Sequence, residues 1–326
     1  MSLKNDIYLA MKRSIYLLFL TLQGLTLNQT FAQKTIQKET LVYKSEEGLE
    51  LKLDKYVSSV PADHKRPVMI YVHGGGFAMG SSKNALQIKY NKHFAEQGFV
   101  SISINYRLGL AGNQQPDMTA INNAVSMGTE DLLDVTKFIL SKAEEWNIDT
   151  QKIMISGGSA GAIACLTAEY AICSENSVAS GLPADFNYAG VISHAGNVIV
   201  QEDTLNWKRK PCPMLLMHGS LDQLVSFDSK KVDNTLFAGS LYLHRQFEQA
   251  GWAHWLFEEV GADHIVALKP LQYNFPEIDS FIERFVMKSS EAIIHTQWTD
   301  KTPGSMDKMF DIVPLYMTGW DKTDEE

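Results

Sequence analysis

The sequence is poor in cysteine, and its few cysteines show no spacing typical of a metal site. The 326 residues include Cys165, Cys173 and Cys212, and an odd count leaves at least one thiol unpaired within the chain. Cys165 and Cys173 fall on one predicted helix, where their separation would be about 12 Å. That distance is too long for a disulfide. We therefore expect the thiols to pack in the core, and we expect neither a metal ion nor a cofactor.

An excess of positive charge is also missing. The chain has 29 Lys and Arg against 38 Asp and Glu, which gives a formal net charge of -9. Proteins that bind nucleic acids neutralise phosphates with a basic surface. Nucleic acid is therefore not an expected partner.

Long apolar runs are absent except near the N-terminus. Lys12 and Arg13 precede an apolar stretch at 15–27, and residues 30–32 (Thr-Phe-Ala) resemble a small-residue cleavage site. Polar residues and a glycine interrupt the stretch, which disfavours a membrane span. We predict that residues 1–32 are a signal peptide of an exported protein, periplasmic or secreted, with no stable membrane span once the leader is removed. An uncleaved N-terminal membrane anchor is the alternative.

Residues 33–290 alternate between strand-like and helical patterns. Residues 40–56 have the pattern of a half-buried hairpin, 67–72 are a continuous apolar run, and 99–104 are predicted to be the next strand. Such runs are typical of parallel strands that are covered on both faces. The alternation predicts a single α/β domain with a doubly wound, mostly parallel sheet. Residues 291–326 lie beyond this pattern and are predicted to form a C-terminal extension.

Other segments of the domain carry weaker patterns. Residues 108–128 have no clear period and are predicted to be a loop beside the site, followed by a helix over 129–147. Residues 197–210 are predicted to be a short insertion that forms a flap over the site. A helix is expected within 227–251.

Residues 153–162 read Ile-Met-Ile-Ser-Gly-Gly-Ser-Ala-Gly-Ala, in which an apolar run ends in glycines and a helical pattern begins at once. Ser159 stands between Gly157 and Gly161, which is the Gly-x-Ser-x-Gly pattern of a strand–turn–helix. Glycines permit a turn too tight for side chains. The helix points the positive end of its dipole toward charge that develops at the serine. A plain glycine-rich loop has the same pattern, so other features must decide.

Three further segments rich in polar residues and glycine each follow a predicted strand, namely His73–Gly76, His218–Asp222 and Gly261–His264. In open α/β sheets, sites gather outside the carboxyl ends of the strands. Adjacent strands would therefore bring these segments to the serine.

The residue types in these segments suit acyl transfer. A serine hydroxyl needs a base, a histidine can take and return its proton, and a carboxylate fixes the histidine tautomer. Ser159, Asp222 and His264 occur in the chain order expected of α/β-hydrolases. The triple-glycine turn can aim backbone N–H groups at an oxyanion, and the N–H of Ala160 adds another.

Through these motifs the chain resembles the α/β-hydrolase esterases, specifically the hormone-sensitive-lipase-like carboxylesterases. Its short predicted lid also places it near the acetyl-xylan and feruloyl esterases. The resemblance runs from about Val68 to Phe285. It rests on His73–Phe77, Tyr106-Arg107, Gly157–Gly161, His218–Asp222 and Gly261–His264.

The resemblance implies an α/β-hydrolase fold with a mostly parallel eight-stranded sheet, flanking helices and a small or absent lid. It implies that Ser159 is the nucleophile, His264 the base and Asp222 the carboxylate partner. One departure is Ala162, where many relatives have a further glycine. The implied oxyanion-hole donors are Gly75, Gly76 and Ala160.

Other residues compete for these assignments or are expected to support them. We expect His73 and His218 to bond backbone near the loops. Tyr106 and Arg107 are expected to brace a strand end, with a substrate contact as the alternative. The rivals for the base and its partner are His194, His244, His254, Asp228 and Asp263. Residues that could line the substrate pocket, or equally pack in the core or flap, are Phe77, Met79 and Trp207.

The first functional hypothesis is hydrolysis of a carboxylic ester through an acyl-enzyme on Ser159. The export signal and short lid suggest short acyl groups, above all acetyl, with carbohydrate esters as a candidate beside other small-molecule esters. A second hypothesis keeps the triad but changes the bond to an amide, a formamide or a short peptide. A third is a catalytically silent binding module on the same fold. The sequence does not indicate the substrate-binding residues or the oligomeric state.

Overall fold

The structure is a computed structural model that describes residues 35–46, 48–301 and 312–317. All described residues belong to the unit Thr35–Glu326. The predicted signal peptide, residues 1–32, lies outside the described residues. Within the described ranges, none of the helices combines the length and the hydrophobicity that a membrane span requires.

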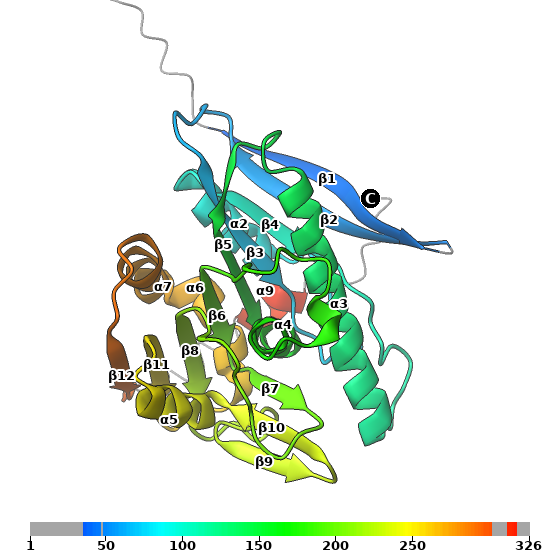
Figure 1. The fold of residues 1–326 in the computed structure, drawn as a ribbon, viewed down its shortest axis with the longest axis vertical. Helices are drawn as coiled ribbons and strands as arrows, with labels where there is room; N and C mark the ends of the chain where they lie inside the picture. Colours follow the sequence, from blue (N-terminus) through cyan, green and yellow to red (C-terminus); the bar gives the residue numbers. More distant parts are fainter. Residues whose placement is uncertain (1–34, 47, 302–311, 318–326) are drawn as a thin grey trace, which may run out of the picture. The chain divides into compact units, whose positions relative to one another are not determined.

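Nine strands of the described residues form one sheet in the order β1-β2-β4-β3-β5-β6-β8-β11-β12 (Figure 1). The strands β1 and β2 pair antiparallel, and β2 pairs antiparallel with β4. All later neighbours pair parallel, so the predicted mostly parallel sheet is confirmed. The strands are β1 (Ile36–Glu46), β2 (Leu49–Ser58), β3 (Arg66–Val72), β4 (Val100–Ile104), β5 (Ile148–Gly158), β6 (Gly190–His194), β8 (Met214–Gly219), β11 (His254–Glu259) and β12 (Ile293–Trp298).

The ninth strand exceeds the predicted eight and comes from the predicted C-terminal extension. Strand β12 pairs parallel with β11, with Ile293 opposite His254. Its sequence, Ile-Ile-His-Thr-Gln-Trp, has no alternation of apolar and polar residues, so the sequence did not single it out.

The central strands are buried on both faces, as the continuous apolar runs predict. In β3, Val68, Ile70 and Val72 pack into one hydrophobic cluster, while Met69 and Tyr71 pack into another on the opposite face. The helices over the first cluster are α3 (Met118–Ser141), α4 (Ala160–Cys173) and α5 (Ser240–Ala250). The opposite face is covered by α2 (Ala85–Glu96), α6 (Pro270–Tyr273), α7 (Phe275–Phe281) and the π-helical turn η3 (Ile282–Met287).

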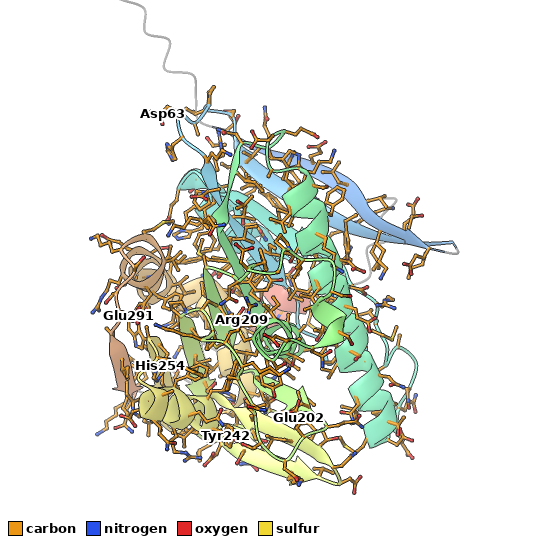
Figure 2. All side chains as sticks on the ribbon, viewed as in Figure 1. Asp63, Glu202, Arg209, Tyr242, His254 and Glu291 are labelled. Carbon is orange, nitrogen blue, oxygen red and sulfur yellow. The ribbon has the colours of Figure 1, made fainter. Side chains whose placement is uncertain are left out.

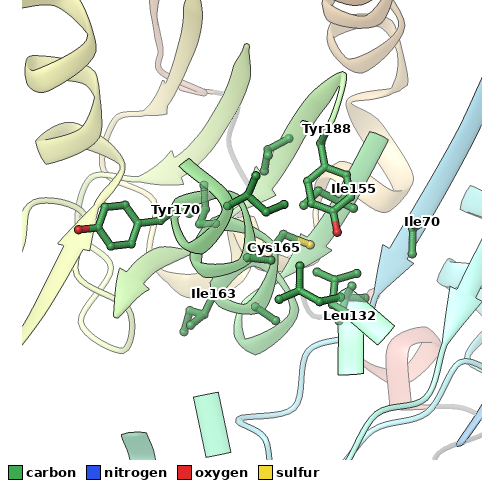
Figure 3. Packing of buried hydrophobic residues seen from close by; sticks show 14 of the residues in the cluster. Ile70, Leu132, Ile155, Ile163, Cys165, Tyr170 and Tyr188 are labelled. Atoms are coloured by element: carbon green, nitrogen blue, oxygen red, sulfur yellow. The ribbon is translucent and has the colours of Figure 1, made fainter. Parts of the chain in front are cut away.

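Figure 3 shows how the first cluster packs around α4. Cys165 lies there with Leu132 of α3 and Ile155 of β5. All three cysteines are buried and unpaired, which agrees with the predicted packing role.

Helix α3 begins earlier than predicted. It starts at Met118, because the side chain of Asp117 caps it by accepting the backbone N–H of Ala120 at 2.8 Å. The predicted loop therefore ends at 117, and the helix ends at Ser141 rather than at 147. The first turns of α3 lie largely at the surface, so their apolar period is weak.

A second sheet of three strands was not predicted. It has the order β7-β10-β9, with β7 (Asn197–Val200), β9 (Ser229–Val232) and β10 (Thr235–Gly239) all antiparallel. The helix expected within 227–251 is confirmed as α5, but it starts only at Ser240 after this hairpin.

The rest of the predicted flap packs beside α4 and α5. The Tyr170 hydroxyl of α4 donates to Glu202 at 2.8 Å, and the Trp207 ring N–H donates to Gln246 of α5 at 3.1 Å. Figure 2 labels Glu202 and, on α5, Tyr242 in this region. The segment 201–210 is therefore held against the flank of the domain.

A buried carboxylate ties the end of β4 to α3 and β1. Asp131 has no exposed surface and accepts both the Nε–H and the backbone N–H of Arg107, each within 3.0 Å. Lys44 of β1 adds a contact at 3.2 Å. Beside Arg107, the Tyr106 hydroxyl donates to the carbonyl of His73 at 2.9 Å. These contacts agree with the predicted bracing role of Tyr106 and Arg107.

We expect Asp131→Asn to lower the free energy of unfolding by about 2 kcal/mol, because it removes the buried charge that accepts from Arg107 and Lys44 and leaves them only the more exposed Glu130 and Asp134. The matched control is Asp134→Asn, one turn away. Asp134 is partly exposed and pairs with Lys44 and Lys137, so it should cost less than about 1 kcal/mol. Urea denaturation of both variants measures the difference, and equal losses would contradict it.

Candidate active site

Ser159 stands at the tight turn between β5 and α4, in an unusual backbone conformation. Its φ is 52° and its ψ is -121°, a region that residues with a Cβ rarely occupy and that stores strain. The backbone N–H of Ser159 donates to the carbonyl of His194 at the end of β6, at 2.9 Å. The turn therefore raises the serine at the carboxyl edge of the sheet, as the Gly-x-Ser-x-Gly pattern predicts.

The glycines around the serine are required by close backbone contacts. A Cβ on Gly157 would lie 2.4 Å from the carbonyl carbon of Gly161. A Cβ on Gly161 would in turn lie 2.0 Å from the carbonyl oxygen of Val72 in β3. No side chain fits at such distances, so strand, turn and helix can approach only with glycine at these positions.

The structure brings Ser159, His264 and Asp222 together in one hydrogen-bonded series. His264 Nε2 lies 2.9 Å from Ser159 Oγ, and His264 Nδ1 lies 2.7 Å from Asp222 Oδ2. An ionised carboxylate only accepts, so His264 Nδ1 carries the hydrogen and Nε2 is left to accept the serine proton.

Asp222 is held as a carboxylate. Its Oδ1 accepts the backbone N–H groups of Leu224 and Val225, both at 2.9 Å. Burial raises the pKa of Asp222, but the hydrogen bonds from His218 and His264 outweigh burial and leave the pKa well below its usual range. Asp222 therefore stays charged wherever His264 could act as a base.

The loop after β3 turns sharply beside the serine. Gly75 and Gly76 have φ values of 116° and 63°, and a Cβ on Gly75 would lie 2.0 Å from the carbonyl oxygen of Met79. His73 Nδ1 donates to the Gly74 carbonyl at 2.7 Å, which is the backbone contact expected of this histidine. Burial lowers the pKa of His73 to about 4, so its ring is neutral.

The expected oxyanion donors lie around the same space as the serine. Gly75, Gly76 and Ala160 line one cleft together with Ser159. Ala160 is the first residue of α4, where backbone N–H groups have no partner within the helix and carry the positive end of its dipole. This edge of the cleft suits a developing negative charge.

The cleft has a volume of about 880 Å³ and is lined mostly by apolar side chains. Apart from Ser159 and His264, its polar side chains are Gln223 and Asp263. Of residues 197–210, only Ile199 lines it. The apolar lining is Phe77, Leu110, Pro116, Ile121, Ala160, Ile163, Ile199, Leu224, Val225, Phe237, Ile265, Ala267, Leu268, Val313 and Met317.

The rival histidines and carboxylates have other partners or positions. His244 Nδ1 and His254 Nε2 lie 2.7 Å apart beneath α5, and His194 is fully buried at the end of β6. Asp228 pairs with Arg245 on the surface. The Asp263 carboxylate accepts the backbone N–H of Ile265 at 3.0 Å, so it caps the turn after it.

Of the three candidate pocket residues, Phe77 lines the cleft, whereas Met79 and Trp207 do not. Trp207 packs edge-on against Tyr170 and Phe247. Most of the lining, including the contributions of β7 and β10, was not predicted. Nothing local marks an apolar residue as facing a cleft rather than the core.

No group of three or more His, Cys, Asp and Glu side chains in the described part of the chain is arranged to hold a metal ion.

Comparisons with known proteins find similarity to lipases and esterases over part of the chain. A family model described as BD-FAE matches residues 53–197. The chain is 32% identical over 124 residues to Lipase 1 of Geotrichum candidum, covering 37% of this chain and 22% of the lipase. It is 30% identical over 120 residues to Gut esterase 1 of Caenorhabditis elegans, covering 37% of this chain and 20% of that protein.

A solved structure extends the likeness to most of the chain. The apo form of Thermogutta terrifontis esterase 2 superposes with a TM-score of 0.56 at 21% identity, over 78% of this chain and 95% of that one. Another sequence match, to a non-reducing polyketide synthase of Acremonium egyptiacum, covers 44% of this chain at 30% identity. The chain spans only 6% of that synthase and about a fifth of the lipase and the gut esterase.

We expect Gly161→Ala to destabilise the fold by about 3 kcal/mol, because the added Cβ would overlap the backbone of β3. Helix propensity alone predicts the opposite sign, a gain of up to about 1 kcal/mol. The control, Gly98→Ala, has a positive φ and open space around the Cβ, so it should cost about 1 kcal/mol from backbone strain. Urea denaturation decides, and a stable Gly161→Ala variant would refute the close approach.

Proposed function

We propose that this protein, which has the α/β-hydrolase fold, is a serine carboxylic ester hydrolase that works through an acyl-enzyme on Ser159. The observation that carries the proposal is the series Ser159–His264–Asp222, with contacts of 2.9 and 2.7 Å at the edge of a cleft. The lipase and esterase relatives support ester hydrolysis as the activity.

Acylation begins when Ser159 Oγ attacks the carbonyl carbon of the ester. The serine proton moves to His264 Nε2, and the charge of Asp222 stabilises the imidazolium that forms. The carbonyl oxygen becomes an oxyanion. When the tetrahedral intermediate collapses, the alkoxide leaves with the proton from His264 and the acyl group stays on Ser159.

Deacylation repeats these steps with water. A water molecule gives a proton to His264 Nε2 and attacks the acyl carbon. When this second tetrahedral intermediate collapses, the carboxylic acid is released and Ser159 Oγ takes the proton back from His264. In both halves the oxyanion accepts hydrogen bonds from the backbone N–H groups of Gly75, Gly76 and Ala160. The loop after β3 and the first turn of α4 hold these N–H groups in fixed positions, so the donors need not reorganise during the reaction.

The finer predictions on substrate and location rest on the sequence. Acetyl groups, and carbohydrate as their carrier, were inferred from the export signal and the short lid, and they stay predictions. Export through residues 1–32 likewise stays a prediction. An amide or peptide bond would use the same three side chains, and a substrate panel separates it from an ester. A silent binding module is disfavoured because His264 lies within hydrogen-bond distance of both Ser159 and Asp222.

We expect Ser159→Ala to lower kcat for p-nitrophenyl butyrate by at least about 10⁴-fold and to abolish labelling by a fluorophosphonate, because no acyl-enzyme can form. The matched control is Ser156→Ala in the same strand. Ser156 contacts the Tyr90 hydroxyl at 2.9 Å and does not line the cleft, so activity should be retained. Activity or labelling that survives in Ser159→Ala would exclude the assigned nucleophile.

A further inference from the structure

Among the residues that the structure describes, the lining of the cleft beside Ser159 offers few of the polar groups that a sugar needs. A carbohydrate offers many hydroxyl groups, and burying them without partners is costly. The available polar side chains, Gln223 and Asp263, are both exposed and already have local partners. Gln223 donates to the Leu221 carbonyl at 3.4 Å, and Asp263 caps Ile265.

The wall formed by the small sheet is apolar and fixed in place. Ile199 of β7 and Phe237 of β10 are direct partners in the antiparallel pairing, so their side chains share one face. Ile163 of α4 lines the cleft one turn after Ser159. Val313 and Met317 of the helix α9 (Ile312–Met317) add further apolar lining.

From this lining we propose that the substrate is an ester with an extended apolar substituent, and that Ile163, Ile199 and Phe237 determine how well the substituent is held. This inference rests on the proposed esterase function and names its substrate class. A volume of about 880 Å³ lies within the range of sites that enclose drug-sized ligands. An acetyl group, with its single methyl, would leave most of it unfilled.

The expected signature is a rise of kcat/KM with chain length. Each methylene that enters an apolar site contributes about fourfold until the site is filled. Two series test this: p-nitrophenyl acetate, butyrate and octanoate vary the acyl group, and ethyl, butyl and octyl acetate vary the alcohol. A rise in either series supports the proposal and shows which side of the ester enters the cleft. A fall in both overturns it and favours the short-acyl prediction.

Variants then test the wall itself. We expect Ile199→Thr and Phe237→Ser to lower the ratio of long-chain to short-chain kcat/KM about tenfold. Val200→Thr is the matched control, since Val200 is the next residue on β7 and does not line the cleft. An unchanged ratio in both wall variants would overturn the assignment. If kcat/KM falls with chain length in both series while fluorophosphonate labels Ser159 and short esters are cleaved, only the substrate class fails. If no ester is cleaved and no label attaches, the proposed function itself fails.

A different observation concerns His218, which has no exposed surface and contacts the carboxylate of Asp222. His218 Nε2 lies 3.3 Å from Asp222 Oδ2 and 3.1 Å from the carbonyl oxygen of Val225. Both of these neighbours only accept hydrogen bonds, so Nε2 carries the hydrogen. His218 Nδ1 therefore accepts from the hydroxyl of Ser240, which lies at 2.8 Å.

The geometry points to His218 as a positioning residue for the triad. Its N–H shares Oδ2 with His264, while the backbone of the following turn holds Oδ1. The chain of hydrogen bonds runs from Ser240, the first residue of α5, through His218 and Asp222 to His264. Through it, the start of α5 fixes the orientation of the carboxylate.

The test compares His218→Leu, which removes the donor, with His218→Gln, whose amide can place an N–H near the position of Nε2. We expect His218→Leu to lower kcat about tenfold. It should also move the acidic limb of the kcat/KM profile to higher pH, because a carboxylate with one donor fewer holds the imidazolium of His264 more strongly.

His218→Gln should restore both values in part. If His218 served only in packing, His218→Leu would lower the stability of the protein and would not move the acidic limb of the kcat/KM profile. An unmoved limb in folded His218→Leu, or a glutamine variant no better than the leucine variant, would overturn the proposal. Circular dichroism and fluorophosphonate labelling establish the folded fraction in each variant.

Discussion

The close approach of α4 to the carboxyl ends of β3 and β5 is the contact on which the rest of the site depends. Ser159 has a positive φ, which is a strained conformation for a residue with a Cβ. The conformation persists because the surrounding backbone leaves no alternative: Gly157 and Gly161 pack against each other, and Gly161 packs against Val72. Strain of this kind can be maintained only by a rigid, fully covered sheet. The large hydrophobic core on both faces of the sheet is thus required to hold the hydroxyl group of Ser159 in position.

Features with local causes could be predicted from the sequence. The hairpin β1–β2, the buried strand β3 and the glycine turn each follow from a period or a steric requirement within about ten residues. The start of α3 shows the opposite case. Its capping residue, Asp117, was visible, but the first turns lie at the surface and lack the apolar period on which the helix prediction relied. Strands β9 and β10 are short, and their pairing is not local: β10 pairs with the distant β7, and β9 pairs with β10.

The parts of the site also differ in whether their cause is local in the sequence or depends on distant segments. Ser159, Asp222 and His264 could be proposed because each follows a strand whose end must lie at the same edge of the sheet. The lining of the cleft could not, because Ile199 and Phe237 face it only through the register between β7 and β10. The contact of His218 with Asp222 lies between these cases. The two residues are four apart in sequence, but only the turn after β8 shows that the imidazole reaches the carboxylate.

Strand β12 changes the exposure of the sheet at its far edge. Without it, β11 would be the terminal strand, and its main-chain donors and acceptors would form a template for pairing with another copy of the chain. Parallel pairing with β12 covers that row, and His295 and Gln297 reach back to Glu258 at 2.9 and 3.0 Å. Within β12 the polar residues His295, Thr296 and Gln297 lie between the exposed Ile293 and Trp298. The strand that leads directly into the loop of His264 thus has a partner on both sides, and β12 rather than β11 is the terminal strand of the sheet that the described residues form.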